Sequence, residues 1–287
     1  MDCHHTYIWK IPFNKDLHHQ HWFKLWVTES CSIRLLGKLS GYSKFKLNGI
    51  KNYWLDHSPH EQPDYTGVRY AVYDATYFHK DGCLISLMDA TNQKIMASIY
   101  VQKESFKDAY PWFMHLKSQG FAPCFITTDG EQSILRALNM VWPGVKLQRC
   151  LYHLQHEGMR WLRTYPKTEA GVMLRNILAR LSSIKTTTEK DHFISEYQNW
   201  IHNYKDYVLS LPRTQVAYKD IKRTMSLINN ALADMFYYLL DPNVHSSTNA
   251  LEGFHSRLKA DYRRHRGLSK EHKLQYLKWY CYFENTN

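Results

Sequence analysis

The sequence predicts an α/β protein with a mixed five-stranded sheet, flanking helices, an α-helical insertion and an N-terminal helical segment. Three observations support this fold class. Apolar and β-branched residues between positions 69 and 101, interrupted by two tight-turn sequences, favour a three-stranded meander. Two further strand patterns follow, each preceded by a helical pattern. From about residue 154 to residue 241 the apolar residues recur at helical spacing.

The composition indicates a folded, basic protein. Its 287 residues suffice for two or three domains, and 44% hydrophobic residues argue against long disorder. Lys and Arg number 37 against 26 Asp and Glu, and the net charge of +11 favours a polyanionic partner, with nucleic acid as the leading candidate. No stretch approaches the roughly 18 apolar residues of a membrane span. We therefore expect no membrane partner and a cytoplasmic, nucleoid-associated protein if the host is a prokaryote.

The six cysteines lack the dense spacing of a disulfide framework, so we expect free thiols. They stand at positions 3, 31, 83, 124, 150 and 281. Cys3-His4-His5 is compatible with the end of a metal-binding segment, but no partner pair at zinc-finger spacing follows it.

Residues 1–60 are expected to form a helical DNA-binding segment, in which Ser40-Gly41-Tyr42 separates two helices. The first helix carries Ile33, Leu35, Leu36 and Leu39, and the second, capped by Ser43, carries Phe45, Leu47, Ile50, Trp54 and Leu55. In a helix-turn-helix the second helix enters the DNA major groove. Lys44, Lys46 and Lys51 would then contact DNA. A helical hairpin with a solvated basic face is the alternative.

Residues 66–153 are expected to form the first part of the sheet domain. After the meander, Ser105 caps a helix that ends near Gly120. The segment PCFITTDG supplies a fourth strand ending at Asp129, EQSILRALNMVWPG a helix, and VKLQRCLYH a fifth strand. An antiparallel meander followed by parallel crossovers gives a mixed sheet, in which the first and fourth strands can be neighbours.

Residues 154–245 form the expected helical insertion, and residues 246–287 are expected to return to the sheet domain as helices. Asp241-Pro242-Asn243 ends the insertion. A further helix is predicted to start near Thr248 or Asn249 and to carry Glu252.

Three carboxylates occupy notable places in this arrangement. Asp74 lies inside an apolar strand, Asp129 lies at the carboxyl end of the fourth strand, and Glu252 lies in the first turn of a helix after the insertion. If the first and fourth strands are adjacent, the two aspartates can converge at one edge of the sheet. Clustered carboxylates repel one another unless cations neutralise them, and oxygen-rich clusters suit Mg²⁺ or Mn²⁺. Two such ions can support phosphodiester displacement.

Each carboxylate also has a structural interpretation. Asp74 is compatible with a strand-end residue paired with a lysine. Asp129-Gly130 is a common turn pair, and Asp129 is compatible with a cap for the helix that follows. Glu252 completes Asn249-Ala-Leu-Glu252, the asparagine version of a capping box.

Four motifs together resemble a known family. They are YDATYF with Asp74, ITTDGEQSI with Asp129, QRCLYH with Cys150-x-x-His153, and STNALEGFHSRLK with Glu252. They resemble the DDE transposases of bacterial insertion sequences and their Mutator-like relatives, which have an RNase H-like catalytic domain. The resemblance covers roughly residues 68–266. Many members begin with a longer DNA-binding region, so a truncated or internally initiated copy is compatible with this sequence.

The resemblance implies a site. Asp74, Asp129 and Glu252 would be the catalytic triad and would bind two Mg²⁺ or Mn²⁺ ions. Cys150 and His153 match the family's Cys-x-x-His motif, for which we expect a structural or DNA-contacting role, because a zinc site needs two further ligands and none is evident nearby in the sequence. The alternative for this pair is a packed thiol and a hydrogen-bonded histidine.

Basic residues follow Glu252 closely along its predicted helix. They are Arg257, Lys259, Arg263, Arg264 and Arg266. We expect them to hold DNA backbone near the carboxylates, with a solvated helix face as the alternative.

The expected function is therefore DNA transposition: metal-dependent cleavage at element ends and strand transfer into target DNA. Double-stranded DNA, as terminal inverted repeats and target, is the expected partner, and the need to cut two ends suggests at least a homodimer on DNA. One alternative is a catalytically silent, transposase-derived DNA-binding regulator. Another is a nuclease or integrase-like enzyme of the same fold that processes other DNA.

Overall fold

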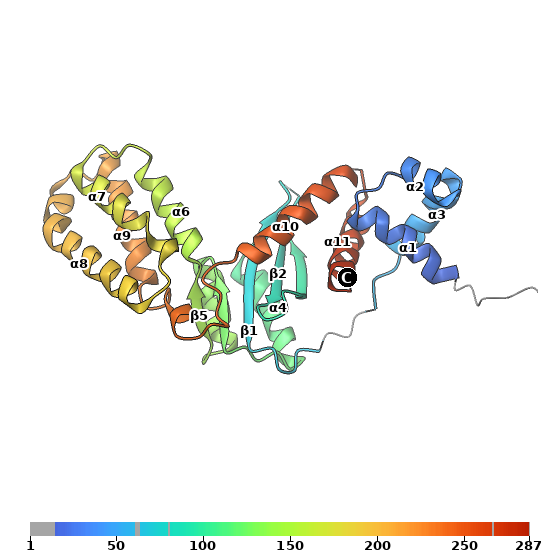
Figure 1. Cartoon of the computed structure of the whole chain (residues 1–287), viewed down its shortest axis with the longest axis horizontal. Coiled ribbons are helices and arrows are strands. Elements are labelled where there is room, and N and C mark those ends of the chain that lie inside the picture. Colours follow the sequence, from blue (N-terminus) through green and yellow to red (C-terminus); the bar gives the residue numbers. More distant parts are fainter. Residues whose placement is uncertain (1–14, 61–63, 80, 266, 287) are drawn as a thin grey trace, which may run out of the picture. The chain divides into compact units, whose positions relative to one another are not determined.

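The computed structural model describes residues 15–60, 64–79, 81–265 and 267–286 (Figure 1). The chain divides into two compact units: residues Pro63–Phe254 form one, and Met1–Gln62 together with His255–Asn287 form the other. Cys3-His4-His5, which the sequence raised as the end of a metal-binding segment, lies outside the described residues, as does Arg266.

The unit Pro63–Phe254 is built on a five-stranded mixed sheet with strand order β3-β2-β1-β4-β5. Its strands are β1 (Tyr70–Tyr77), β2 (Cys83–Asp89), β3 (Ile95–Val101), β4 (Phe125–Thr128) and β5 (Lys146–Arg149). The meander is confirmed, since β1 pairs antiparallel with β2, and β2 with β3. The adjacency of the first and fourth strands is also confirmed, because β1 and β4 pair in parallel.

The turn between β2 and β3 forms as the sequence predicts. The Asp89 carboxylate accepts a hydrogen bond from the backbone N–H of Thr91 at 2.8 Å, and Asn92 accepts one from the N–H of Lys94 at 2.8 Å. Such side-chain bonds to the backbone two residues later are the reason that Asp and Asn favour turns.

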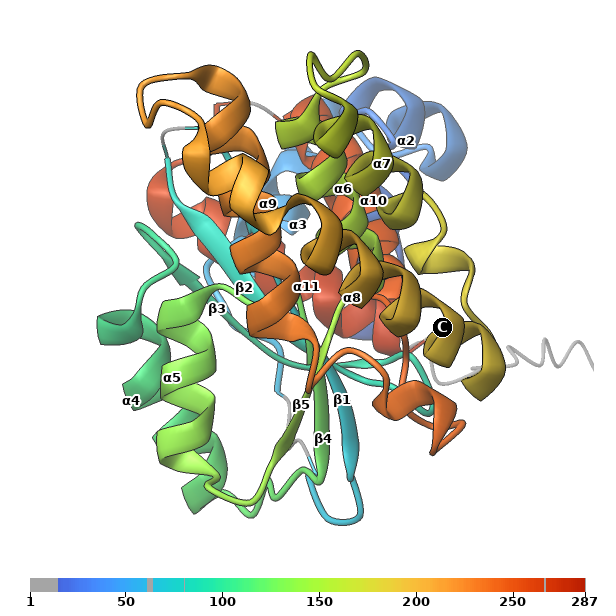
Figure 2. The same cartoon turned by 90° about the vertical axis from the view of Figure 1, so that its left-hand side faces the viewer.

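Two helices cover one face of the sheet and close its core. Helix α4 (Phe106–Ser118) is capped by the Ser105 hydroxyl, as predicted, and α5 (Gln132–Val141) follows β4. Figure 2 shows α4 and α5 together on one side of the strands. Both helices bury an apolar stripe against β1, β2 and β4, in a core cluster that includes Phe113 and Leu138 from the helices and Tyr73 and Ile126 from the strands.

The fifth strand is shorter than expected. It ends at Arg149, and helix α6 (Leu151–Leu162) begins at once, so the predicted strand through His153 is wrong over its last part. The change follows from packing, because Leu151, Leu154 and Leu162 form a helical stripe that is buried in the insertion's core. The Cys150 N–H still donates to the Thr128 carbonyl at 2.8 Å, which ties the start of α6 to the end of β4.

The insertion is helical, as expected. It contains α6, α7 (Glu169–Leu178), α8 (Thr187–Ser210) and α9 (Val216–Ala231), with short 3₁₀ turns η1 (Leu181–Ser183) and η2 (Tyr237–Leu239). These helices share a hydrophobic core of their own. The chain then returns along β5: the Arg149 N–H donates to the Asp234 carbonyl, and the Leu151 N–H to the Ser246 carbonyl, both at 2.9 Å.

The second unit contains α1 (Lys15–Thr28), α2 (Ile33–Ser40), α3 (Lys44–Leu55), the later turns of α10 (Asn249–Tyr262), η3 (Arg263–His265) and α11 (Lys270–Asn285). Helix α11, red in Figure 1, lies beside α1. The Phe23 ring of α1 contacts Trp279 and Phe283 of α11 at centroid distances of 5.5 and 5.9 Å. This grouping differs from the sequence expectation that residues 246–287 belong with the sheet, because the aromatic side chains of α11 are buried against α1.

The helical pair at residues 33–55 has the predicted boundaries. Ser32 and Ser43 cap α2 and α3, and Gly41 ends α2 with φ of 73°, a backbone conformation that glycine adopts readily. The expected apolar stripes are only partly buried. Leu36, Leu47, Ile50 and Leu55 are in the core, whereas Leu35, Leu39 and above all Phe45, at 90% exposure, face outward.

None of the described helices is both long enough and apolar enough to cross a bilayer.

Candidate functional site

Asp74 and Asp129 project from equivalent points of two adjacent parallel strands. Val72 of β1 and Thr127 of β4 are register partners, and each aspartate follows its partner by two residues. Residues two apart on a strand share a face, and neighbouring strands lie about 4.8 Å apart. Asp74 is buried on β1, where it pairs with Ser86 of β2, and Asp129 is the first residue after β4. The register therefore predicts that the two carboxylates are neighbours.

The turn after β4 fixes the Asp129 side chain. Its Oδ1 accepts hydrogen bonds from the Glu131 N–H at 3.1 Å and from the Thr128 hydroxyl at 3.3 Å. The α5 cap itself is Glu131, whose carboxylate accepts from the Ser133 N–H. Asp129 is thus a turn residue and not the helix cap.

A buried arginine stabilises this turn by a hydrogen bond to its backbone. Arg149, at the end of β5, donates from Nη2 to the Asp129 carbonyl at 3.2 Å, and its Nε has no hydrogen-bond partner in the described structure. Burial lowers the pKa of the Arg149 guanidinium, and the Asp129 charge opposes that shift. Gly130 has φ of 91°, and a Cβ at this position would overlap the guanidinium. The turn therefore requires glycine for two independent reasons.

A third carboxylate, Glu104, lies near the aspartates. It precedes α4 and accepts a hydrogen bond from the Tyr73 hydroxyl at 2.8 Å. Burial, followed by the charge of Asp129 and then that of Asp74, raises the pKa of Glu104 to about 7, while the bond from Tyr73 opposes the shift. The strand end therefore concentrates negative charge in a partly desolvated place.

Glu252 has different neighbours. Its Oε1 accepts a hydrogen bond from the Thr248 hydroxyl at 2.8 Å and lies 3.6 Å from Nδ1 of His153. His153 Nδ1 lies 3.3 Å from the Cys150 sulfur, to which the Thr248 N–H also donates at 3.4 Å. The bond to Cys150 is the main cause that raises the pKa of His153 to about 9; the charges of Cys150, Glu252 and Asp129 add to it, and burial opposes it.

Cys150, His153 and Glu252 offer ligand atoms that all lie within 4.8 Å of one another. Among the described residues, no other set of three or more potential metal ligands lies this close together. Asp74, Asp129 and Glu252 do not form such a set. The structure thus puts Asp74 on β1 and Asp129 directly after the neighbouring β4, and it brings Glu252 to the Cys-x-x-His motif. The helix of Glu252 starts at Asn249, in the predicted place. The residue whose side chain contacts the Glu252 carboxylate is Thr248, however, and not Asn249, which the sequence suggested as the cap.

The basic candidates are mostly exposed. Lys44 and Lys46 are exposed on α3, whereas Lys51 is half-buried, with Nζ 5.8 Å from the centroid of the Trp26 ring, and burial lowers its pKa. In the same unit, Arg257, Arg263 and Arg264 are exposed and Lys259 is half-buried. Arg257 forms an ion pair with Glu284 at 3.9 Å.

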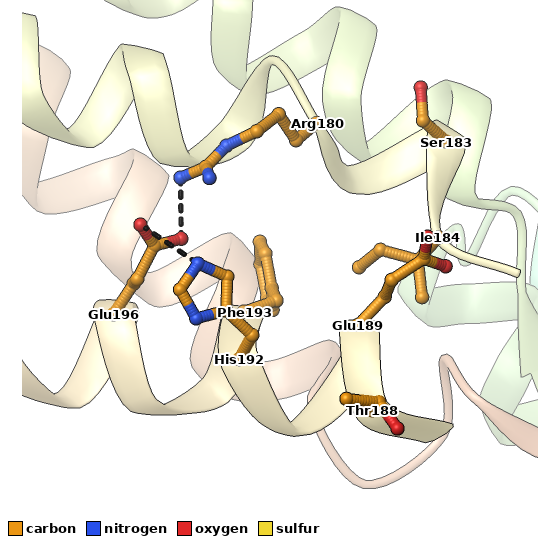
Figure 3. A pocket seen from close by; sticks show the side chains of 8 residues that line it. All are labelled: Arg180, Ser183, Ile184, Thr188, Glu189, His192, Phe193 and Glu196. Carbon is orange, nitrogen blue, oxygen red and sulfur yellow. Dashed lines mark hydrogen bonds and ion pairs between the residues drawn. The ribbon is translucent and has the colours of Figure 1, made fainter. Parts of the chain in front are cut away.

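The insertion carries a cavity of about 430 Å³ lined by residues of η1 and α8 and of the segments that flank η1 (Figure 3). Arg180 and His192 both reach Glu196 there, and Ile184 and Phe193 supply apolar walls. None of the predicted site residues lines this cavity.

Comparison with known protein families identifies the family of this chain. A family model described as "Transposase, Mutator family" matches residues 85–272, which is more than half of the chain. The chain belongs to the Mutator family of transposases. Membership connects this Mutator-family transposase with DNA transposition and with DNA as substrate. The strand order and the flanking helices agree with the RNase H-like core that the sequence implied.

Other comparisons add little. Among curated proteins, nothing matches this transposase. Among solved structures, it is similar to a chain of the simian T-cell lymphotropic virus intasome in complex with PP2A regulatory subunit B56γ, with a TM-score of 0.25 and 14% identity. The alignment covers 72% of this chain and 68% of that one.

Glu104, Arg149 and Thr248 are the residues at these sites that sequence reasoning missed. Glu104 stands before a Ser-capped helix, where an acidic residue has an ordinary explanation. Arg149 and Thr248 belong to the motifs QRCLYH and STNALEGFHSRLK. An arginine at the end of a predicted buried strand was the one available signal, because such a charge requires a partner.

Proposed function

We propose that this transposase cuts DNA at the ends of its mobile element and joins the freed ends to target DNA. Asp74 and Asp129 would be ligands of two Mg²⁺ or Mn²⁺ ions, and Glu252 would be the third catalytic carboxylate. The observation that supports this most strongly is the equivalent position of Asp74 and Asp129 on adjacent parallel strands, within a chain of a transposase family.

The donor set fits these metals. Mg²⁺ and Mn²⁺ prefer carboxylate oxygens and retain waters that a substrate phosphate can replace. Burial, and after it the charges of Asp129 and Asp74, raise the pKa of Glu104, and a divalent cation bound there would offset the negative charge. When bound, such ions supply Lewis-acid stabilisation of the attacking and leaving oxygens of the phosphodiester.

The protein's own part is to position the ligands. Asp74 lies within strand β1, where it pairs with Ser86 of β2, and a ligand on such an element is held more rigidly than one on a loop. Asp129 is fixed by the Glu131 N–H and the Thr128 hydroxyl, and its backbone is held by Arg149. Both ligands are therefore preorganised before DNA binds.

Glu252 must move to take part. Its carboxylate now contacts Thr248 and His153, and its side chain is about one third exposed (32%). The proposal requires this side chain to leave Thr248 and turn toward the aspartates in the DNA complex. A glutamate has three rotatable side-chain bonds for such a change.

The reaction would proceed in two displacements at one site. First, a water oxygen attacks the phosphodiester at the element's end, the bond to the 3′ oxygen breaks, and a 3′-hydroxyl and a 5′-phosphate result. Second, that 3′-hydroxyl attacks a target phosphodiester, joins its 5′ side, and releases a target 3′-hydroxyl. No net oxidation or additional reactant is involved.

We propose that basic side chains hold the DNA. Lys44 and Lys46 would contribute most from α3 because they are exposed, and Lys51 less because it packs over Trp26. Further contacts are proposed for His153, Arg257, Lys259, Arg263 and Arg264. Two element ends must be cut, so a homodimer or larger assembly on DNA is part of the proposal.

The test is a cleavage and strand-transfer assay with Mg²⁺ and DNA carrying the sequences that flank the gene. Asp74→Asn, Asp129→Asn and Glu252→Gln should each abolish both products. Asp89→Asn is the matched control, because Asp89 begins the same Asp-Ala-Thr tripeptide but lies in the β2–β3 turn. Cleavage by Asp74→Asn at the parent rate would refute the assignment. DNA binding without any cleavage would favour the silent regulator, and cuts without joined products would favour a nuclease.

A further inference from the structure

Four side-chain atoms from two segments that are distant in sequence cluster at the start of α6. The Cys150 sulfur and His153 Nδ1 are 3.3 Å apart, and His153 Nδ1 and Glu252 Oε1 are 3.6 Å apart. The Thr248 hydroxyl lies 3.5, 3.4 and 2.8 Å from the sulfur, the imidazole nitrogen and the carboxylate oxygen respectively.

The two separations between proposed ligand atoms, 3.3 Å from the Cys150 sulfur to His153 Nδ1 and 3.6 Å from His153 Nδ1 to Glu252 Oε1, match those of ligands around zinc. Zinc binds sulfur at about 2.3 Å and nitrogen or oxygen at about 2.0–2.2 Å in a tetrahedron, which places neighbouring ligand atoms about 3.3–3.8 Å apart. Ordinary hydrogen bonds produce similar distances, so the donor types decide between the two. The donor types favour the metal, because thiolate, imidazole and carboxylate on one centre is a zinc-type ligand set and not a magnesium-type one.

The backbone holds the ligands in this arrangement. Cys150 is tied to Thr128 by its N–H, and residues 150 and 153 lie one turn apart at the start of α6. Thr248 and Glu252 lie one turn apart at the start of α10, where the Glu252 N–H donates to the Thr248 carbonyl at 3.0 Å. The Leu151 N–H to Ser246 bond joins the two segments directly. Preformed sites of this kind lower the cost of ordering ligands around an ion.

One side of the cluster is open. Cys150 and Thr248 are fully buried, whereas the side chains of His153 and Glu252 are about one third exposed. An ion can therefore enter from the His153 and Glu252 side, and a water molecule can occupy the remaining position, as in zinc sites with three protein ligands.

We propose that Cys150, His153 and Glu252 bind a zinc ion, with Thr248 orienting the Glu252 carboxylate through its hydroxyl and a water molecule completing the tetrahedron. The site is separate from Asp74 and Asp129. Binding releases protons from the ligands, so zinc affinity rises with pH.

Sharing Glu252 has a consequence that rests on the proposed function. A carboxylate bound to zinc is not available to the aspartates, so zinc would inhibit cleavage by competing for Glu252. The binding claim itself does not depend on catalysis.

Binding is tested by titrating the full-length protein with Co²⁺, a spectroscopic substitute for zinc, in a Cys3→Ser background that removes the soft ligand at the N-terminus. We expect one Co²⁺ per chain, with a thiolate-to-cobalt charge-transfer band and the visible bands of tetrahedral cobalt, both removed by one equivalent of Zn²⁺. Cys150→Ser should abolish the charge-transfer band, and Cys124→Ser, the control, should retain it. Thr248→Val should weaken zinc binding about tenfold.

No charge-transfer band, or an equal band in Cys150→Ser, would overturn the proposal. If Cys150→Ser does not fold, Glu252→Gln decides instead: an unchanged affinity overturns the site, and a loss of at least about tenfold supports it. A second assay adds Zn²⁺ to the Mg²⁺-dependent cleavage reaction, where we expect inhibition in the parent and its relief in Cys150→Ser. Absence of all cleavage would refute the proposed function and leave the cobalt result to decide the site.

Discussion

Asp74 and Asp129 are in register: each lies two residues beyond a paired residue, Val72 on β1 and Thr127 on β4. The two residues come from different parts of the sequence, and the parallel pairing of β1 with β4 puts them at the same level along the sheet. This relationship connects fold and chemistry in this transposase, since any change in the β1–β4 register would separate them.

The first prediction concerns metal and stability. With Mg²⁺ at about one hundred times its dissociation constant, the parent should gain about 2.7 kcal/mol, a rise in Tm on the order of 5–10 °C. Asp74→Asn and Asp129→Asn should lose this response, because each removes one of the proposed metal ligands. Thermal unfolding with and without Mg²⁺ measures both effects. A full Mg²⁺ response in either variant would contradict the assignment.

The second prediction concerns Glu104 and pH. The folded protein holds a proton on Glu104 up to about pH 7, whereas a solvated glutamate loses it near its ordinary pKa of 4.5. Stability from this group is therefore complete below pH 4.5 and is lost as pH rises to about 7. Glu104→Gln should gain little at pH 4.5 and on the order of 3 kcal/mol at pH 8, when measured without divalent cations.

Chemical denaturation at the two pH values checks this, with Asp206→Asn as the control because Asp206 is an exposed carboxylate on α8. An equal gain for Glu104→Gln at both pH values would show that the carboxyl is not protonated in the fold.

The third prediction concerns the turn after Asp129. Gly130→Ala should destabilise the protein by about 2–4 kcal/mol, because the new Cβ meets Arg149 and the backbone has a left-handed φ. It should also reduce cleavage, since Asp129 would shift with the turn. Gly144→Ala is the control: no atom lies within 4 Å of its added Cβ, and we expect a change within about 0.5 kcal/mol. Equal stabilities of the two variants would refute this account of the turn.

The fourth prediction concerns DNA affinity. Replacing both Lys44 and Lys46 with alanine should weaken binding to any duplex and lower the slope of log K against log salt by about two. Lys51→Ala should change that slope by less than one, because the ammonium group lies over Trp26. Salt-dependent binding by fluorescence anisotropy measures the slopes. An equal slope change for all three lysines would mean that Lys51 contacts DNA as the others do.

Local patterns predicted much of this fold. The meander followed from its turn residues, since Asp89 and Asn92 form the bonds expected of them. The helices at residues 33–40 and 44–55 followed from Ser32, Gly41 and Ser43, whose effects act within a few residues. The β1–β4 pairing followed from the rule that a parallel crossover returns beside an earlier strand.

Other features depended on distant parts of the chain. Cys150 and His153 read as the end of a strand because Val145 and Leu147 alternate with polar residues, as in a short strand, and only the insertion's core converts the following residues to helix. The placement of α11 depends on Phe23, which is far away in sequence. The raised pKa of Glu104 arises from tertiary burial, which no local pattern reports. For Glu252, the sequence correctly gave the helix, but its contact with the Cys-x-x-His motif needs the return path of the insertion.

That return path also bears on how such a chain can change over time. The insertion leaves the sheet at Leu151 and comes back at Ser246, and a single backbone hydrogen bond joins those two residues. The whole insertion between them is thus a long loop whose two ends are held together by this hydrogen bond. Because closing a longer loop costs only about 0.6 kcal/mol for each doubling of its length, α6 to α9 can grow, shrink or be exchanged at small cost. The contact between Leu151 and Ser246 must be kept, since it sets the position at which the helix of Glu252 begins.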